Sequence, residues 1–286
     1  MNRQTAEHIL EVQALRFRYP DGSVGLDGCS LSIRRGSRTA LLGANGAGKT
    51  TLFLHLNGIL RPKSGTVLFE GLPVDYGRRG LHHLRARVGL VFQNPDCQLF
   101  SARVREDISF GPLNLGLDAG TVRNRVEEAL QAVSMTAYAD KPVHNLSFGQ
   151  KKRVCIAGVL AMRPEVLILD EPMAGLDVAM QAELAHILDR LHVEGLTVII
   201  ATHDMDYAYQ WADVLAIMDQ GACAASWDVE QLPACLDQLE RFGVGVPRVA
   251  EMRKALAACG LFGADLPAVR SHSELCDAIA AVGSSP

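Results

Sequence analysis

The fold is indicated by the stretch Gly43-Ala44-Asn45-Gly46-Ala47-Gly48-Lys49-Thr50, which joins a short apolar run at residues 39–43 to a helical pattern at residues 50–58. It matches G-x-x-x-x-G-K-S/T, a loop whose glycines allow backbone N–H groups to surround a phosphate. In this pattern Lys49 reaches the β- and γ-phosphates, Thr50 binds Mg²⁺, and the next helix points its N-terminus at the anion. A purely structural glycine turn is the alternative, which the lysine and threonine together disfavour.

A second stretch places two carboxylates at the end of an apolar run. Residues 166–169 form a continuous β-type run, and Asp170 and Glu171 follow it directly. In a parallel sheet, Asp170 would lie at the carboxyl edge, where Mg²⁺ binds, and Glu171 would lie beside the attacking water. A buried strand with acidic residues in its exit turn is the alternative. Together with Lys49 and Thr50, the two carboxylates favour a nucleotide site.

A third stretch precedes a basic helix and reads Leu146-Ser147-Phe148-Gly149-Gln150. Ser147 and Gln150 predict an S-x-x-Q capping box for the helix that begins there. The same geometry also presents a helix N-terminus, a hydroxyl and the amides beside Gly149, which together can receive a γ-phosphate.

Residues 1–225 are predicted to form one α/β domain. The apolar runs at residues 166–169 and 197–201 are separated by a helical stretch at residues 178–192, which is typical of a doubly wound parallel sheet. Three further parts complete the domain: an antiparallel β lead-in (12–18 and 25–33), strands at 65–71 and 88–92, and a helical insert at about 94–162 with Val122, Val126, Leu130 and Val133 on one face.

Residues 226–286 are predicted to be a small C-terminal helical domain. Three short amphipathic helices are expected at residues 229–242, 249–259 and 271–282, the last with a Ser271/Glu274 capping box. Such short helices cannot bury their apolar stripes alone. They either fold back on the first domain or pair with the same segment of a second copy, and we favour the pairing.

Composition narrows the function classes. The 286 residues carry a formal net charge of −4, so nucleic acid is not expected as a partner. Seven cysteines occur without a C-x-x-C pair, and we interpret them as reduced core thiols of a cytoplasmic protein. No apolar leader and no run near the ~20 apolar residues of a membrane span is apparent, so any membrane-spanning subunits are expected to be other polypeptides.

With these motifs in order, the chain resembles the ABC ATPase superfamily over about residues 8–225, and its 146–150 segment resembles the signature loop L-S-G-G-Q. The resemblance implies an ABC-type P-loop NTPase with a RecA-like core, which binds ATP and Mg²⁺. It implies that Tyr19 stacks on adenine, that Gln93 senses the γ-phosphate and Mg²⁺, and that His203 contacts the γ-phosphate. Tyr19 as an ordinary strand-end aromatic and His203 as a helix cap are the alternatives.

The superfamily pairs two chains head to tail, so the resemblance implies a homodimer that encloses two ATP molecules and closes when they bind. Each site would combine two sets of residues, and Asp177 would lie at the dimer interface. The first set is Tyr19, Gln93, Asn45, Gly46, Ala47, Gly48, Lys49, Thr50, Thr51, Asp170, Glu171 and His203; the second, from the other copy, is Ser147, Gly149 and Gln150. Glu171 would act as the base.

A narrower resemblance concerns the segment Gln93-Asn94-Pro95-Asp96-Cys97-Gln98-Leu99-Phe100, which is similar to the Q-N-P-D-x-Q-L-F of energy-coupling-factor ATPases, in particular those of cobalt and nickel uptake. Residues 148–154 and 245–251 look like the same branch. Phe148, Gly175 and Cys97 depart from the commoner pattern. The match implies a transmembrane coupling subunit, a solute-selecting membrane subunit, and a peripheral place on the cytoplasmic face of the membrane; vitamin uptake is an alternative.

Other readings remain open for some residues. Leu99 and Phe100 fit either a groove for a transmembrane coupling helix or core packing. The pair His82-His83 favours a solvated helix face over a metal site, because adjacent helical residues point apart. A soluble ABC protein of DNA repair or translation is disfavoured, since neither a long coiled coil nor a tandem cassette is present. A small-molecule kinase would leave residues 146–150 unexplained.

Overall fold

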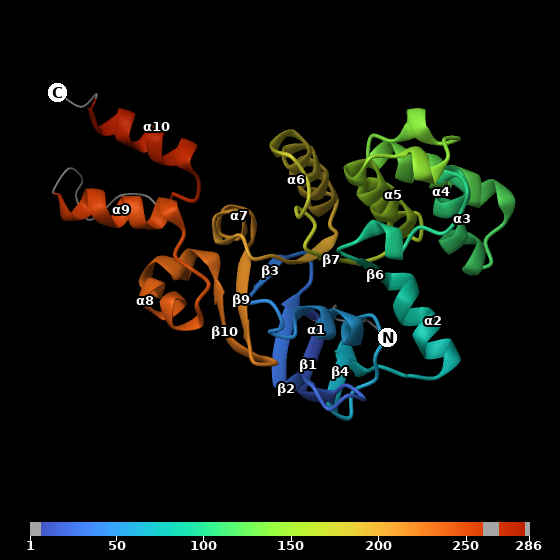
Figure 1. Cartoon of the computed structure of the whole chain (residues 1–286), viewed down its shortest axis with the longest axis horizontal. Helices are drawn as coiled ribbons and strands as arrows, with labels where there is room; N and C mark the ends of the chain where they lie inside the picture. The colour runs from blue at the N-terminus through green and yellow to red at the C-terminus, as the bar shows by residue number, and fades with distance from the viewer. Residues whose placement is uncertain (1–6, 260–268, 284–286) are drawn as a thin grey trace.

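The centre of the chain is a parallel sheet, as predicted. The computed structural model describes residues 7–259 and 269–283. Its larger sheet has the order β10-β9-β3-β8-β7-β6, in which only β10 runs antiparallel to its neighbour (Figure 1). The strands are β3 (Arg38–Leu42), β6 (Val88–Val91), β7 (Val166–Asp170), β8 (Thr197–Ala201), β9 (Val214–Asp219) and β10 (Ala222–Asp228). Strands β7 and β8 are buried along their whole length, which explains their unbroken apolar sequence.

The antiparallel lead-in forms a second sheet with the order β2-β1-β4-β5. Its strands are β1 (His8–Arg18), β2 (Val24–Arg34), β4 (Ser64–Phe69) and β5 (Leu72–Pro73). Helix α1 (Lys49–Leu56) shares one apolar core with both sheets, since Leu52 and Phe53 pack with Val12 of β1 and Ile168 of β7. The antiparallel sheet therefore holds the start of α1 against the parallel strands.

The predicted helical insert is also present. It consists of α3 (Val104–Asn114), α4 (Ala119–Ala132) and α5 (Phe148–Leu160), preceded by α2 (Arg78–Arg87) and the 3₁₀ turn η1 (Pro95–Cys97); shorter turns are η2 (Thr136–Tyr138) and η3 (Val143–Asn145). The expected face of α4 is buried, with Val122, Val126 and Leu130 in the core. Helices α6 (Val178–Val193) and α7 (Met205–Trp211) return the chain to the sheet. The predicted fold class is confirmed.

The prediction of a continuous first helix in the C-terminal segment is wrong. Residues 229–242 form three short pieces, η4 (Val229–Ala234), α8 (Leu236–Leu239) and η5 (Glu240–Phe242), because Pro233 lacks the N–H that a continuous helix needs. The other two helices are close to their predicted bounds, α9 (Arg248–Ala258) and α10 (His272–Gly283). Only half of the capping box forms: the Ser271 hydroxyl accepts the Glu274 N–H at 3.1 Å, but the Glu274 carboxylate accepts the Arg270 N–H.

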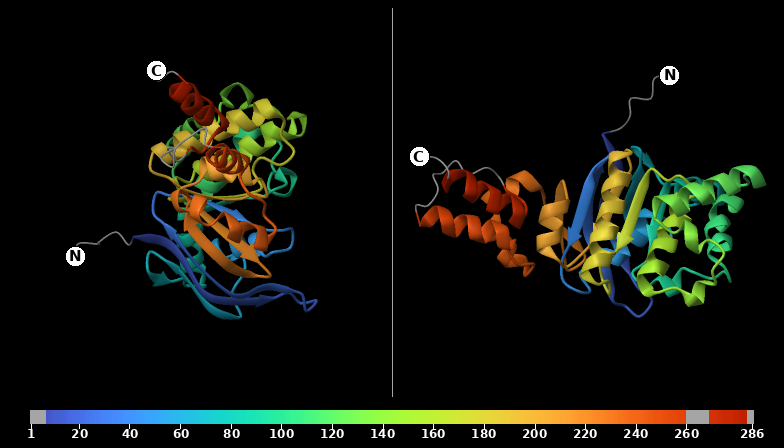
Figure 2. Two further views of the ribbon diagram at one scale, coloured as in Figure 1. Left: turned by 90° about the vertical axis from the view of Figure 1, so that its left-hand side faces the viewer. Right: turned by 90° about the horizontal axis from the view of Figure 1, so that it is seen from above.

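This C-terminal segment folds back on α7, the alternative that the sequence analysis favoured less. Leu232 and Leu275 are buried in one core with Tyr209 and Trp211 of α7. The Arg270 guanidinium donates to the carbonyls of Tyr209 and Ala212. Figure 2 shows the segment at the opposite end of the molecule from the helical insert. Pairing with a second copy stays a prediction. The apolar side chains of Met252 and Ile279 are exposed and could contact such a copy.

The interpretation of the cysteines as core thiols is only partly right. Cys29 and Cys155 are buried, whereas Cys97, Cys259 and Cys276 are exposed: Cys97 ends the turn η1, Cys259 follows α9 and Cys276 lies on α10, and no described residue buries them. Within the described residues, no helix combines the length and the apolar character that crossing a membrane requires.

Candidate nucleotide site

The phosphate loop depends on glycines whose positions tolerate no side chain. Gly43 and Gly48 have positive φ angles of 143° and 103°. A Cβ on Gly43 would lie 2.2 Å from the carbonyl oxygen of Met218 in β9, and one on Gly48 would lie 2.6 Å from the carbonyl oxygen of Gly25 in β2. The loop therefore contacts the backbones of both sheets, which fixes its amides in place.

Lys49 is a buried cation that forms no ion pair with a carboxylate of the described residues at hydrogen-bonding distance. Its side chain is 7% exposed, and its ammonium donates to the carbonyl oxygens of Gly43 at 2.6 Å and Ala44 at 3.1 Å. Carbonyl dipoles satisfy the hydrogen bonds but do not neutralise the charge. The site thus favours an anionic ligand such as the phosphates of a nucleotide.

Thr50 and Asp170 meet at the carboxyl edge of β7. The Thr50 hydroxyl donates to the Asp170 carboxylate at 2.6 Å. Burial raises the pKa of Asp170, while the Thr50 hydrogen bond and the Lys49 charge act in the opposite direction. A hydroxyl and a carboxylate are the hard oxygen donors that Mg²⁺ prefers, so this pair fits a magnesium ion.

Glu171 and His203 form the opposite wall. Glu171 has a positive φ of 47°, an uncommon conformation for a residue with a side chain. Its carboxylate lies 3.0 Å from Nδ1 of His203, and its N–H donates to the Ala201 carbonyl at 3.1 Å. The strained backbone thus presents the carboxylate toward the space in front of the phosphate loop.

These residues line a single cavity of about 670 Å³. It includes Tyr19, Gln93, Asn45, Gly46, Ala47, Gly48, Lys49, Thr50, Thr51, Asp170, Glu171 and His203 from the sequence analysis. The Tyr19 hydroxyl is 2.9 Å from that of Thr51, so this aromatic ring lies beside the loop. Ser23, Val24 and Gly25 also line the cavity and were missed, because the start of a strand carries no motif.

Ser147, Gly149, Gln150 and Asp177 are absent from the lining of this cavity. The capping box at the start of α5 is confirmed: the Ser147 hydroxyl accepts the Gln150 N–H at 3.3 Å, and the Gln150 side chain accepts the Ser147 N–H at 3.0 Å. Asp177 caps α6 by accepting the Met180 N–H at 2.8 Å. The 146–150 loop is therefore a formed helix N-terminus outside the nucleotide cavity of its own chain.

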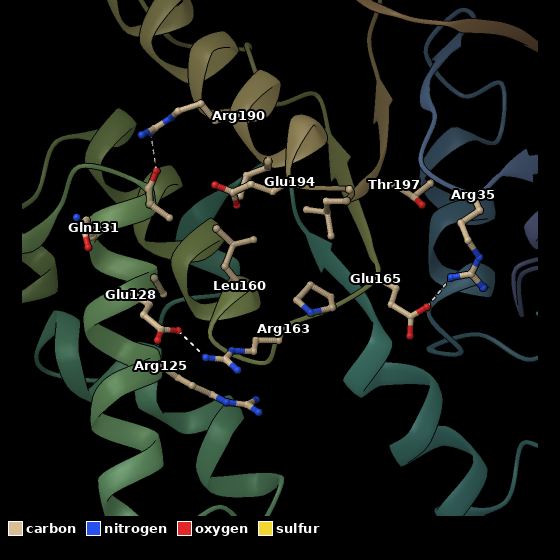
Figure 3. A pocket seen from close by; sticks show the side chains of 16 residues that line it. Arg35, Arg125, Glu128, Gln131, Leu160, Arg163, Glu165, Arg190, Glu194 and Thr197 are labelled. Carbon is tan, nitrogen blue, oxygen red and sulfur yellow. Dashed lines mark hydrogen bonds and ion pairs between the residues drawn. The ribbon is translucent and has the colours of Figure 1, made fainter. Parts of the chain in front are cut away.

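A second cavity of about 680 Å³ lies at the opposite edge of the parallel sheet, where β7 and β8 begin (Figure 3). Its arginines are engaged by the protein itself. Arg163 pairs with Glu128 at 2.8 Å and Arg35 with Glu165 at 2.7 Å, while Arg190 donates to the Ala132 carbonyl at 2.9 Å. This cavity contains neither the phosphate loop nor the carboxylates Asp170 and Glu171 that line the nucleotide cavity.

His82 and His83 do not converge. His82 lies 3.3 Å from the carbonyl oxygen of Asn114, whereas the ring of His83 lies edge-on to Phe69. Both side chains are exposed, as the sequence analysis favoured.

The class of protein follows from the fold and the nucleotide cavity. A phosphate loop joins β3 to α1, and Asp170 and Glu171 lie at the carboxyl end of β7, one strand beyond β8, so the chain is a P-loop cassette that binds and hydrolyses ATP.

Comparison with known proteins identifies the family. The ABC transporter profile matches residues 26–174, and the chain belongs to this family. It is 47% identical to the energy-coupling factor transporter ATP-binding protein EcfA of Methanocaldococcus jannaschii, over 87% of this chain and 89% of that protein. It is 45% identical to EcfA3 of Clostridium perfringens, over 87% and 88%. The solved structure of cbiO1 from Clostridium perfringens, described as part of the ABC transporter complex cbiONQ, is similar with a TM-score of 0.74 at 44% identity, covering 87% of this chain and 99% of that one.

Proposed function

We propose that this chain powers an importer of the energy-coupling-factor type, for cobalt or nickel ions, by closing as a homodimer around two ATP molecules. The observation that carries the proposal is that the expected phosphate-binding residues lie in two separate places on the chain. Twelve of those expected from the sequence line one cavity, and the capped N-terminus of α5 lies outside it. A second copy of the chain would supply that N-terminus.

The chemistry assigned to the cavity is hydrolysis of the γ-phosphate. Lys49 would bind the β- and γ-phosphates, and the Glu171 carboxylate would accept a proton from the attacking water. Its neighbour His203 would contact the γ-phosphate, and Gln93 would report its presence to the helical insert. Mg²⁺, held by Thr50 and Asp170, would supply positive charge to the phosphate oxygens.

Dimer closure would follow from the position of the 146–150 loop. Its helix N-terminus, the Ser147 hydroxyl and the amides beside Gly149 offer donors to an anion. In a head-to-tail pair with two-fold symmetry, each loop would meet the γ-phosphate bound by the other chain. Removing that phosphate by hydrolysis would release the contact, so the pair would act as a two-state switch.

A surface beside the nucleotide cavity suits a transmembrane coupling subunit. A cavity of about 650 Å³ is lined by apolar side chains that include Ile59, Phe100 and Phe110. Phe100 is 63% exposed and its ring lies 4.7 Å from that of Phe110, whereas Leu99 packs against the core. The buried Asp107 carboxylate accepts the N–H groups of Phe100 and Ser101 and holds this loop in place. We assign Phe100 to the docking groove and Leu99 to core packing.

The relatives support the choice of importer type. EcfA proteins are named as energy-coupling factor transporter ATP-binding proteins, and cbiO1 as part of a transporter complex. The proposal extends that role to this chain, with a coupling subunit and a solute-selecting subunit in the membrane and this chain on its cytoplasmic face.

Two measurements test the proposed function. Affinity purification of the tagged chain from detergent-solubilised membranes should recover integral membrane proteins, and Phe100→Glu should reduce that recovery without changing ATP affinity. Cells that express the complete complex should accumulate cobalt or nickel, measured by elemental mass spectrometry, and Glu171→Gln should abolish the uptake. Recovery of the chain without membrane proteins would contradict the transporter role. Uptake of a vitamin in place of either metal would contradict the assigned solute.

A further inference from the structure

A buried lysine near the nucleotide cavity has no role in the proposed chemistry. Lys152 lies one turn into α5 and is 2% exposed. Its ammonium donates to three carbonyl oxygens, those of Glu171 at 3.0 Å, Pro172 at 2.8 Å and Ala174 at 2.8 Å. A lysine ammonium has three hydrogens, so the three bonds use its full donor capacity.

All three acceptors belong to the loop that carries the catalytic carboxylate. This loop joins β7 to α6 and begins at Glu171, whose φ of 47° is strained. The Glu171 N–H donates to the Ala201 carbonyl, and the Glu171 carbonyl accepts both the Lys152 ammonium at 3.0 Å and the Ala174 N–H at 3.2 Å. A strained conformation persists only where its surroundings determine it. Lys152 is the one side chain among these three groups.

Packing alone does not account for a lysine at this position. A buried cation that is hydrogen-bonded only to carbonyl groups still costs free energy because its charge is not neutralised, and an apolar side chain would fill the same space without that cost. Burial lowers the pKa of Lys152 to about 8, with the Glu171 charge acting in the opposite direction. The ammonium lies 5.2 Å from the centre of the Phe148 ring, in the first turn of α5. Lys152 thus joins the start of α5 to the backbone of Glu171.

We propose that Lys152 is a positioning residue that sets the orientation of Glu171 and ties it to the position of α5. The inference rests on the proposed role of Glu171 as the base. Because the N-terminus of α5 would contact the ATP of the second chain, a movement of that helix would be transmitted to the base of its own chain. Lys152 does not line the nucleotide cavity, so ATP binding should be independent of it.

The first test separates catalysis from binding. Lys152→Met removes all three donors while keeping the length of the side chain, and Lys152→Gln keeps two donors. Since a misplacement of about 1 Å can cost about a hundredfold in rate, we expect kcat to fall roughly ten- to a hundredfold in Lys152→Met, with KM and ATP affinity within about twofold of wild type. Lys152→Gln should recover part of the loss.

Lys141→Met is the matched control, because Lys141 is an exposed lysine of the helical insert whose ammonium lies over the Tyr138 ring. It should leave kcat unchanged. If Lys152→Met does not fold, Lys152→Gln carries the test alone. A folded Lys152 variant with wild-type kcat would overturn the inference, and so would equal losses of kcat and ATP affinity.

The second test uses mixed dimers with one intact base. One protomer carries Glu171→Gln and its partner retains Glu171. Lys152→Met is then placed in either protomer. We expect the rate to fall when it is in the protomer that retains Glu171, and to stay unchanged when it is in the other. Equal losses in both arrangements would contradict direct positioning.

The outcomes also distinguish this inference from the proposed function. If Glu171→Gln alone hydrolyses ATP at the wild-type rate, the assignment of the base fails. If Glu171→Gln is inactive and Lys152→Met is fully active, only the positioning role fails.

Discussion

Gly48→Ala should destabilise the chain more than Gly46→Ala, although both glycines belong to the same loop and both have positive φ angles, 103° and 83°. An alanine in this region costs about 1–2 kcal/mol of backbone strain at either position. At Gly48 the new Cβ would also lie 2.6 Å from the carbonyl oxygen of Gly25, whereas at Gly46 it meets nothing within 4 Å. Relieving such a backbone clash adds about 1–3 kcal/mol.

The expected loss in the free energy of unfolding is therefore about 2–5 kcal/mol for Gly48→Ala and about 1–2 kcal/mol for Gly46→Ala. Urea unfolding of the nucleotide-free proteins, followed by far-ultraviolet circular dichroism, measures both. Gly48→Ala should also lose ATP binding in titration calorimetry, because the clash displaces the loop from β2. Equal destabilisation by the two substitutions would refute the close contact between the loop and Gly25.

Three further predictions concern Lys49, Asp170 and the C-terminal segment. Lys49→Ala should weaken ATP binding and hydrolysis together, because it removes the charge that meets the phosphates; wild-type affinity in calorimetry would count against the phosphate-loop assignment. Burial raises the pKa of Asp170, so the folded chain favours the protonated carboxyl. The stabilisation from this preference is complete below the ordinary carboxyl pKa of about 3.9, and it is lost as the pH rises through the higher pKa of the folded state. Asp170→Asn should therefore raise the free energy of unfolding of the nucleotide-free chain at pH 7 and less so near pH 4, and a gain independent of pH would contradict the burial of a charge. Truncation after Asp228, where β10 ends, should convert a nucleotide-free dimer to monomers in sedimentation, whereas a truncated chain as dimeric as the intact one would refute pairing through this segment.

The residues of the phosphate site could be predicted from the sequence, because they are recognised by their spacing along a short stretch of chain. Lys49 and Thr50 follow a glycine-rich turn, and Asp170 ends an apolar run, so strand, loop and helix could be placed without tertiary information. The Ser147/Gln150 capping box is local in the same way. Each of these features needs only a few neighbouring residues to be recognised.

Features that depend on contacts between residues far apart in the sequence could not be predicted. The sequence places Lys152 in a basic helix, and only the structure shows that the side chain is buried against the β7–α6 loop. The contribution of Gly25 to the lining of the nucleotide cavity is apparent only in the structure, where β2 lies against the phosphate loop. The C-terminal error had a local cause, since Pro233 was present in the sequence and breaks the predicted helix.

The central claim is ATP-driven pairing of two identical chains, and Glu171→Gln tests it most directly. The variant should bind ATP but hydrolyse it very slowly, so the closed state accumulates. When this substitution is made in the chain truncated after Asp228, which is expected to be monomeric without nucleotide, sedimentation with ATP should show a dimer that contains two nucleotides, and sedimentation with ADP should show monomers. A variant that binds ATP and remains monomeric, and that dimerises only when a different ATPase is added, would contradict the claim.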